Sequence, residues 1–285
     1  MTNLKVNTVS GIGTEGPVLD GGLKFRSLNY LTLPKGDTTQ RGRGRGLWGG
    51  GTTGVSDDTI QYAELSSDGN TIDFGNLSTV NGAPQAVSSS TRCCYGGGNN
   101  HPSYFNKIEF VTIATTSNVT DFGDLNEVRS GGQGCGNETR GIFGPGFNIS
   151  PNRNINALDF ITIATLGNAQ DFGDLTNTAR ERGMGCSNSI RGLSAGGQDP
   201  AATSNIDSVI ISSRGNSIVF GNLSANNINT GANAATTSPT RAVFSGGQTP
   251  SDTNKMEYIE IATGGAASDF GDLVRAQRGG GATSN

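Results

Sequence analysis

The sequence predicts an all-β fold, and within that class a β-propeller of five four-stranded blades. The first observation is a phrase, Asp-Phe-Gly-Asp-Leu or a close variant, whose phenylalanine recurs every 48 to 50 residues, at Phe74, Phe122, Phe172, Phe220 and Phe270. The second is an arginine that opens a short apolar run ending in glycine, at Arg45, Arg92, Arg140, Arg191 and Arg241. Long helical patterns are absent. A repeat of about fifty residues with four strand-like segments is typical of a propeller blade.

Each repeat contains its four segments in a fixed order, as the fourth copy shows. A small, glycine-rich stretch at residues 183–188 precedes the arginine segment, which begins at Arg191. An alternating apolar run follows at residues 206–211. A Gly-Asn pair, Gly215-Asn216, then marks a tight hairpin turn before the Phe220 phrase. We therefore expect an inner strand, two middle strands and an outer strand in every blade.

The ends of the chain predict how the ring closes. The first copy lacks an inner strand, because residues 41–46 run directly into Leu47. The last copy is followed by one spare segment, residues 279–285, which aligns with the inner strand at residues 183–188. We expect this segment to complete the first blade and so to remove an exposed sheet edge. The propeller domain would then span residues 41–285.

Composition limits the classes of function. The net charge is −4 and the pI is about 5.0, which favours neither nucleic acid nor an anionic membrane as a partner. No apolar run reaches the roughly 18 residues of a membrane span. We expect no cofactor and no metal site. The four cysteines occupy small or apolar columns of the repeat, so they predict free structural thiols: Cys93, Cys94, Cys135 and Cys186.

Residues 1–40 stand outside the repeat and predict an extended attachment arm. They are too few to hold a core alone, and their extended, partly alternating pattern suits a segment that docks on a partner. The anchoring residues that we expect are Leu4, Val6, Val9, Ile12, Val18, Leu23 and Phe25. The partner would be another protein or a second copy of this chain, so the arm also predicts a homo-oligomer as one arrangement.

Variable loops supply the candidate binding residues. In a propeller, the loops between the second and third strands share a face with the links between blades, and binding residues gather on such loops. The candidates are His101, Tyr104, Phe147, Arg153, Arg180 and Arg182. For each residue alone, an ordinary solvated loop side chain is the competing interpretation.

The sequence does not predict an enzyme. His101 is the only histidine, which leaves one candidate for any histidine-dependent triad. Most carboxylates recur as repeat aspartates, a pattern that indicates turns or ion pairs more than acid–base chemistry. A glycosidase pair from irregular positions, such as Glu138 and Asp199, stays open at this point.

The repeat unit resembles a kelch repeat. Arg182, the Gly196-Gly197 pair and Phe220 stand in the order in which a kelch blade carries its arginine, its double glycine and its large ring. Phenylalanine replaces the tryptophan of kelch repeats, so the resemblance is to the architecture more than to the consensus. It implies a propeller and assigns no ligand.

A second resemblance covers the N-terminus and the repeat phrase. Residues 1–21, from Met-Thr-Asn-Leu-Lys-Val to Gly-Pro-Val-Leu-Asp-Gly, look like the N-termini of virion structural and tail-fibre proteins of marine tailed phages, notably cyanophages. The phrase Ile-Ala-Thr with Asp-Phe-Gly-Asp-Leu looks like blocks in predicted virion proteins of those phages. This resemblance implies a virion component, assembled in the host cytoplasm, whose partners are capsid, tail or fibre proteins.

The expected function combines these interpretations. The propeller would be displayed on the particle and anchored through the arm, as a tail fibre, an adhesin or a capsid decoration. The alternative is a carbohydrate-binding adhesin that recognises host surface glycans. Multivalent sugar binding would need aromatic platforms in equivalent loops of several blades, and the loops do not repeat their aromatic residues.

Overall fold

The computed structural model of this chain describes residues 44–277, apart from 53, 66–68, 151–152, 177–178, 229–234 and 249. The chain separates into two units, Met1–Thr39 and Gln40–Asn285, and every described residue belongs to the second. The predicted arm at residues 1–40 and the predicted closing strand at residues 279–285 lie outside the described residues. Both therefore stay predictions.

The described residues form five blades of β-strands. Blade I holds β1 (Arg45–Gly49), β2 (Thr59–Glu64) and β3 (Ile72–Asn76). Blade II holds β4 (Gln85–Ser88), β5 (Arg92–Gly96), β8 (Lys107–Thr112) and β9 (Thr120–Asp124). Blade III holds β10 (Gly134–Gly136), β11 (Arg140–Phe143), β14 (Ala157–Thr162) and β15 (Gln170–Asp174). Blade IV holds β16 (Met184–Ser187), β17 (Arg191–Ala195), β18 (Thr203–Ile210) and β19 (Ile218–Asn227). Blade V holds β20 (Ala235–Thr237), β21 (Arg241–Ser245), β22 (Lys255–Glu260) and β24 (Ser268–Asp272).

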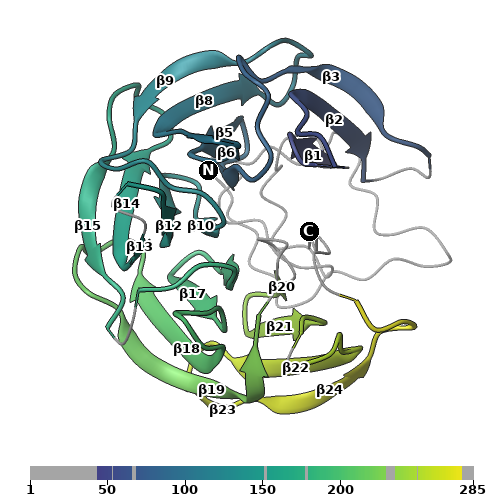
Figure 1. The fold of residues 1–285 in the computed structure, drawn as a ribbon, viewed down its shortest axis with the longest axis vertical. Helices are drawn as coiled ribbons and strands as arrows, with labels where there is room; N and C mark the ends of the chain where they lie inside the picture. Colours follow the sequence, from purple (N-terminus) through teal and green to yellow (C-terminus); the bar gives the residue numbers. More distant parts are fainter. Residues whose placement is uncertain are drawn as a thin grey trace, which may run out of the picture. The chain divides into compact units, whose positions relative to one another are not determined.

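The five sheets are arranged in a ring, so the chain is a five-bladed β-propeller (Figure 1). Within each blade the strands pair antiparallel with their neighbours in the sequence, as in β4-β5-β8-β9 of blade II. Blade I has three described strands, and its first is the arginine strand β1. Blade IV gains a short parallel partner, β23 (Gly265–Ala266), from a loop of blade V. The predicted fold class, the blade number and the order of segments are confirmed.

The repeated phrase forms the outer strand of each blade and contains a β-bulge. In blade II the register with β8 shifts between Ile108 and Glu109, opposite Phe122 and Gly123. The bulge turns the Phe122 ring into the core, where it meets Phe110 edge-on at 5.9 Å between ring centroids. Equivalent edge-on pairs occur in blades I, III and V. A bulge bends a strand and redirects its side chains. This explains why phenylalanine and glycine recur side by side in all five repeats.

The glycine of the phrase lets the next blade approach. Gly123 has a φ of +146°, and a Cβ there would lie 2.5 Å from the carbonyl oxygen of Gly167 in blade III. Around it, the Gly167 amide donates to the Phe122 carbonyl at 2.9 Å. The Asn168 side chain accepts a bond from the Asp124 amide at 3.1 Å. The Gly-Asn turn therefore closes a hairpin and also joins that hairpin to the preceding blade.

Three of the five repeat arginines also form hydrogen bonds to the next blade. The Arg92 guanidinium lies over the Phe110 ring at 4.6 Å and donates from Nη1 to the Ile163 carbonyl of blade III at 3.0 Å. Arg45 and Arg140 make the same bond to the blades that follow them. A cation over a ring face is stabilising, and the bonds of Arg45, Arg92 and Arg140 fasten their blades to the blades that follow.

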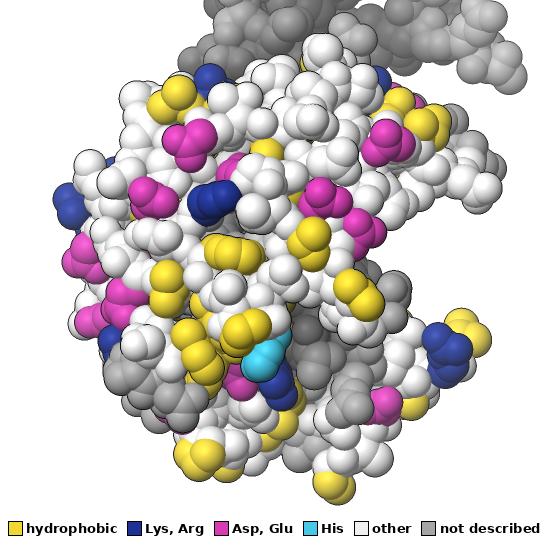
Figure 2. All heavy atoms as spheres, turned by 45° about the horizontal axis from the view of Figure 1, so that its top comes forward, with side chains coloured by type: hydrophobic (Ala, Val, Ile, Leu, Met, Phe, Trp, Pro, Cys, Tyr) yellow, Lys and Arg dark blue, Asp and Glu magenta, His cyan; other side chains and the backbone are white. Residues whose placement is uncertain are grey.

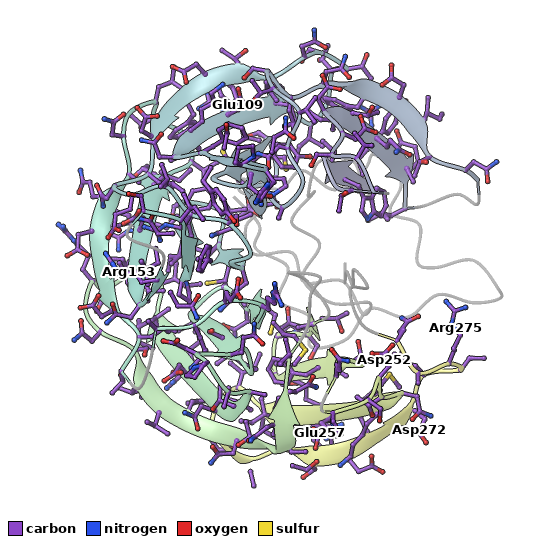
Figure 3. All side chains as sticks on the ribbon, in the orientation of Figure 1. Glu109, Arg153, Asp252, Glu257, Asp272 and Arg275 are labelled. Atoms are coloured by element: carbon purple, nitrogen blue, oxygen red, sulfur yellow. The ribbon has the colours of Figure 1, made fainter. Side chains whose placement is uncertain are left out.

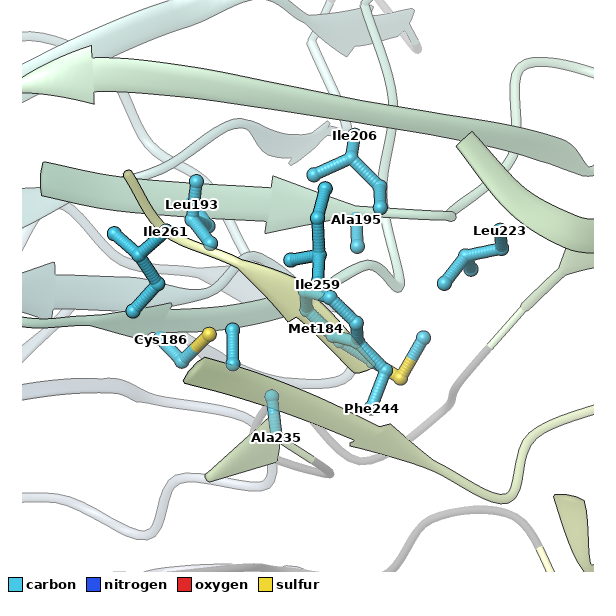
Figure 4. Packing of buried hydrophobic residues seen from close by; sticks show 11 residues of the cluster. Met184, Cys186, Leu193, Ala195, Ile206, Leu223, Ala235, Phe244, Ile259 and Ile261 are labelled. Carbon is cyan, nitrogen blue, oxygen red and sulfur yellow. The ribbon is translucent and has the colours of Figure 1, made fainter. Parts of the chain in front are cut away.

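The hydrophobic core is divided among the contacts between neighbouring blades, which we call seams. Four clusters fill the four seams from blade I to blade V. Figure 4 shows the cluster between blades IV and V, in which Ile206 and Leu193 face Phe244 and Ile259. Since each cluster draws on two blades, a single blade cannot bury its apolar residues alone.

The surfaces of blades V and I that a closed ring would bring together are half exposed. Phe270 is 49% exposed, whereas its equivalent Phe122 is 3% exposed. In blade I, Trp48 is 45% exposed and Leu65 is 44% exposed, although Tyr95, the equivalent of Trp48, is buried. Among the described residues no hydrogen bond joins blade V to blade I in the manner of the other seams.

Candidate functional site

The loops and the links lie on one face of the ring, as the sequence predicts. Three isolated β-bridges join a link between blades to the loop of the following blade. They pair Ser130 with Phe147, Glu181 with Gln198, and Ile228 with Gln248. We call this side the loop face. Because the bridges fix the loops to the ring, the side chains that they carry are held in defined positions.

Two loops on this face carry extra β-ribbons. In blade II the ribbon is β6 (Asn99–Asn100) with β7 (Ser103–Tyr104), and in blade III it is β12 (Gly146–Asn148) with β13 (Arg153–Ile155). In the described parts of the other loops, isolated bridges stand in place of a ribbon. The core of the repeat does not require these ribbons, so they mark the part of the ring that differs from blade to blade.

An aromatic pair joins the two ribbons. The rings of Tyr104 and Phe147 lie 5.9 Å apart, tilted by 56°, and both are half-buried. His101 is exposed at the turn between β6 and β7. Figure 2 shows hydrophobic side chains gathered beside the histidine, which is drawn in cyan. The structure thus brings together Tyr104 and Phe147, which are 43 residues apart in the sequence (104 to 147), and His101 lies on the same ribbon as Tyr104.

Polar groups lie on the other face of the β12–β13 ribbon, because Phe147 pairs with Asn154 whereas Asn148 pairs with Arg153. Glu127, from the link that leads to blade III, accepts at Oε2 from Asn148 Nδ2 at 3.1 Å and from Arg153 Nη2 at 3.0 Å. Asn148 is buried and also accepts from the Ser150 amide, so it holds the loop in place. Figure 3 labels Arg153 on blade III. We call His101, Tyr104, Glu127, Phe147 and Arg153 the loop patch.

Sequence reasoning missed Glu127 and Asn148 as members of this region. Glu127 begins one of the variable links, and that was the signal that could have identified it. Asn148 carries no such signal, because an asparagine in a polar loop is ordinary. Its role depends on the Glu127 carboxylate that the ring places beside it.

Arg180 does not lie on the surface, which corrects the prediction that it is a loop-face binding residue. It is fully buried and pairs with Asp207 of blade IV at 2.6 Å. Its Nη2 also donates to the Ser194 carbonyl at 3.0 Å. Arg129 makes the same kind of pair with Asp159 at 2.6 Å. A buried charge needs such a partner, so both arginines fasten a link to the next blade and are unavailable to a ligand.

The acidic partners of these arginines belong to one column of the repeat. Glu109 and Glu257, labelled in Figure 3, hold the equivalent places in blades II and V. There a lysine approaches the carboxylate, with Lys107 Nζ 3.8 Å from Glu109 and Lys255 Nζ 3.3 Å from Glu257. Burial lowers the pKa of Arg129, while the Asp159 charge opposes that effect. These carboxylates are engaged in holding the ring together.

Arg182 lies in the link between blades III and IV, after β15 and before β16. It is exposed and has a left-handed φ of +59°, and its amide donates to the Gly131 carbonyl at 2.7 Å. Its Nε lies 3.5 Å from Glu181 Oε1. A non-glycine residue with a positive φ is uncommon. Here it bends the link that leads to the inner strand of blade IV.

The carboxylates considered for glycoside hydrolysis do not form a pair. Glu138 lies in the turn between β10 and β11, where it accepts from the Ser90 amide at 2.7 Å. Asp199 lies in the loop between β17 and β18, at the opposite end of the strands. Since a glycosidase needs its two carboxylates on either side of one bond, Glu138 and Asp199 cannot serve that chemistry together.

A small cavity lies between blades III and IV. It measures about 20 Å³ and is lined by Ser194, Asp207 and Ser217 among apolar neighbours. Ser194 stands where blades II, III and V carry the buried rings Tyr95, Phe143 and Phe244. The space left by the missing ring suffices for one water molecule, and the cavity belongs to the structure of the seam.

All four cysteines are free, and burial raises the pKa of each thiol. The pKa of Cys93 rises to about 11 and the pKa values of Cys94 and Cys135 to about 12. A neutral buried thiol is a poor nucleophile, so the cysteines pack as small apolar residues. In the described ranges no group of histidine, cysteine and acidic residues has the arrangement of a metal site.

Comparison with known proteins supports the fold and no further assignment. No protein-family profile matches the chain, and no curated protein matches it. Among solved structures, that of the protein YjhT superposes with a TM-score of 0.64 over 82% of this chain and 86% of that chain, at 9% sequence identity. At this identity the likeness concerns the propeller architecture alone. In the part of the chain that the structure describes, no helix is long and apolar enough to cross a membrane.

Proposed function

We propose that this chain is an interaction component of a tailed-phage particle. In this proposal the propeller is displayed on the virion, and residues 1–40 anchor it to capsid, tail or fibre proteins. The resemblance of the N-terminus and of the repeat phrase to virion proteins of marine tailed phages supports the location. The arm is the natural anchor because it stands outside the repeat and carries apolar residues in an extended pattern.

The observation that carries the binding role is the loop patch. It combines an aromatic pair and a guanidinium, carried on two ribbons that the repeat does not require, with a carboxylate from the link that precedes blade III. The ring behind it is a rigid support, since the described seams repeat backbone bonds and carry buried cores. Rigid presentation of a variable loop surface suits recognition.

The test compares the full chain with a chain that begins at Thr39. Each is mixed with particles purified from cells infected by the phage that encodes it, and the particles are then sedimented. We expect the full chain to sediment with the particles and the shortened chain to stay in the supernatant. Circular dichroism of the shortened chain establishes first that its ring is folded.

Two results would contradict the proposal. If the folded, shortened chain sediments as well as the full chain, the arm is not the anchor. If neither chain sediments, and antibodies against the ring do not label purified virions, the chain is not a virion component.

A further inference from the structure

We propose that two copies of this chain associate through the outer edge of blade IV, in a two-fold contact between apolar side chains. Four aliphatic residues form this surface, and we call them the blade IV rim: Ile190, Ile210, Ile218 and Val219. Each is between 37% and 61% exposed. This contact goes beyond the proposed function, because it joins copies of the chain to each other and not the chain to the particle.

The register of the strands makes the blade IV rim continuous. Ile210 pairs with the residue that follows Ile190 in the chain. Ile218 lies opposite Ser208, which is two residues before Ile210 on the neighbouring strand, and side chains in such a diagonal position can reach each other. Val219 is the next residue of β19, the outer strand of the blade, and it extends the surface around the edge of the sheet (Figure 1).

The other blades are mostly polar at the equivalent places. In blades II, III and V the position of Ile190 holds threonine, the position of Ile210 holds threonine or glutamate, and the position of Ile218 holds threonine, glutamine or serine. Blade I has an isoleucine at the third of these places, and a glutamate at the second. The position of Val219 is an exposed aspartate in all four other blades: Asp73, Asp121, Asp171 and Asp269.

The fold of a blade therefore does not require an apolar rim. Blade IV is the one described blade in which all four positions are aliphatic. A continuous exposed apolar surface with polar surroundings indicates a contact with another protein molecule.

Charge favours a second copy of this chain as that molecule. The chain is acidic, with a net charge of −4, and like charges that face each other across an interface oppose association. On the other four blades, the aspartate at the position of Val219 would meet the acidic surface of an approaching copy. The blade IV rim carries no carboxylate, so two acidic rings can meet there without this repulsion. An aliphatic surface is also complementary to itself, as a two-fold contact requires.

The first experiment measures self-association of the full chain. Four aliphatic side chains from each copy make a small contact, so sedimentation velocity is recorded from about 5 μM to about 500 μM. We expect a monomer–dimer equilibrium within this range. The Ile218→Thr/Val219→Asp variant gives blade IV the residues of blade II, and it should weaken the dimer about tenfold or more.

Two controls belong to this experiment. Because blade II folds with threonine and aspartate at these places, the ring of the variant should stay folded, and circular dichroism checks this. Asp121→Asn removes one charge from the rim of blade II and should leave the monomer–dimer equilibrium unchanged.

Cysteine cross-linking tests the two-fold geometry. Equal residues of two copies approach each other near a two-fold axis, so the oxidised Val219→Cys variant should form a covalent dimer. The Asp121→Cys variant carries its cysteine at the equivalent place of blade II and should stay monomeric under the same conditions. Both variants contain the four native cysteines, so these do not account for a difference between them.

Three results would overturn the proposed contact. The first is a full chain that stays monomeric over the whole concentration range. If this chain sediments with particles and the Ile218→Thr/Val219→Asp variant does not, the blade IV rim binds a different virion protein. The second is a dimer that this variant leaves intact, which would assign self-association to another surface, such as the arm. The third is equal cross-linking of the Val219→Cys and Asp121→Cys variants.

Discussion

Within the repeated phrase, phenylalanine and glycine act through different contacts. Phe122 fills the core beside Phe110, whereas Gly123 gives room to the backbone of the next blade. The two are adjacent because the bulge turns one side chain inward and exposes the neighbouring backbone to the Gly167 turn. A single short phrase therefore serves both the core of a blade and the seam beside it.

Replacing a glycine with alanine tests whether the seam needs the close contact between the Gly123 backbone and the turn at Gly167. Gly123→Ala should destabilise the protein more than Gly167→Ala, by about 1–3 kcal/mol in the free energy of unfolding. Both glycines have a φ near +145°, so both variants carry backbone strain. A Cβ at Gly123 also meets the Gly167 carbonyl at 2.5 Å, whereas a Cβ at Gly167 meets nothing within 4 Å. Urea unfolding measures this difference in the free energy of unfolding. Equal losses for the two variants would mean that the Gly167 turn can shift away from a Cβ at position 123 without further destabilisation.

At the scale of the elements, links and strands of neighbouring blades are joined by buried charge. Arg129 lies in the link after β9 and reaches Asp159 in β14, and Arg180 reaches Asp207 in β18 in the same way. Both arginines also donate to backbone carbonyls of the next blade. The links are therefore part of the packed ring, even though their sequence is polar and variable.

Removing one residue of the buried Arg129–Asp159 pair should lower the free energy of unfolding more than replacing both residues. Arg129→Met leaves the Asp159 carboxylate buried without its cation, and we expect a loss of about 3–5 kcal/mol in the free energy of unfolding. The Arg129→Met/Asp159→Leu variant should regain most of that loss, since no uncompensated charge remains. Chemical denaturation of the single and double variants gives the comparison. A double variant no more stable than the single one would argue against this account of the link.

At the scale of the whole molecule, four seams are packed and the surfaces of the fifth are half exposed. Phe270 and Gly271 of blade V occupy the same places as Phe122 and Gly123, and Leu65 of blade I occupies the place of the buried Ile113. Blades V and I thus each have the residues that form a seam elsewhere in the ring, but within the described residues these two surfaces are not packed together. The predicted closing strand at residues 279–285 would lie in this region of the sheet order, beside β1.

Two matched substitutions test how far that fifth seam is covered in the full chain. Phe122→Ala should lower the free energy of unfolding by about 3–5 kcal/mol, as expected for a buried ring. Phe270→Ala should lower it by about 1 kcal/mol, because half of that ring is already in contact with water. Thermal and urea unfolding of both variants provide the measurement. Equal losses would show that Phe270 is covered when the chain is complete.

The sequence by itself determined the fold class, the five blades and the order of strands within each blade. These follow from periodicity, since each repeat carries its own turns and its own apolar columns. Tyr104 and Phe147 were also recognised as loop residues, but their contact was not, because it joins loops of two different blades. Residue patterns describe one blade at a time, whereas such contacts depend on how two blades pack.

Only the tertiary structure decided which polar residues face solvent. Arg153 and Arg180 look alike in the sequence, and both fall in variable segments. The ring leaves Arg153 on the surface beside Glu127 and buries Arg180 against Asp207. The physical reason is that a charged side chain is buried only where the neighbouring blade supplies its counter-charge. Which residues become such neighbours depends on how the blades pack in the ring.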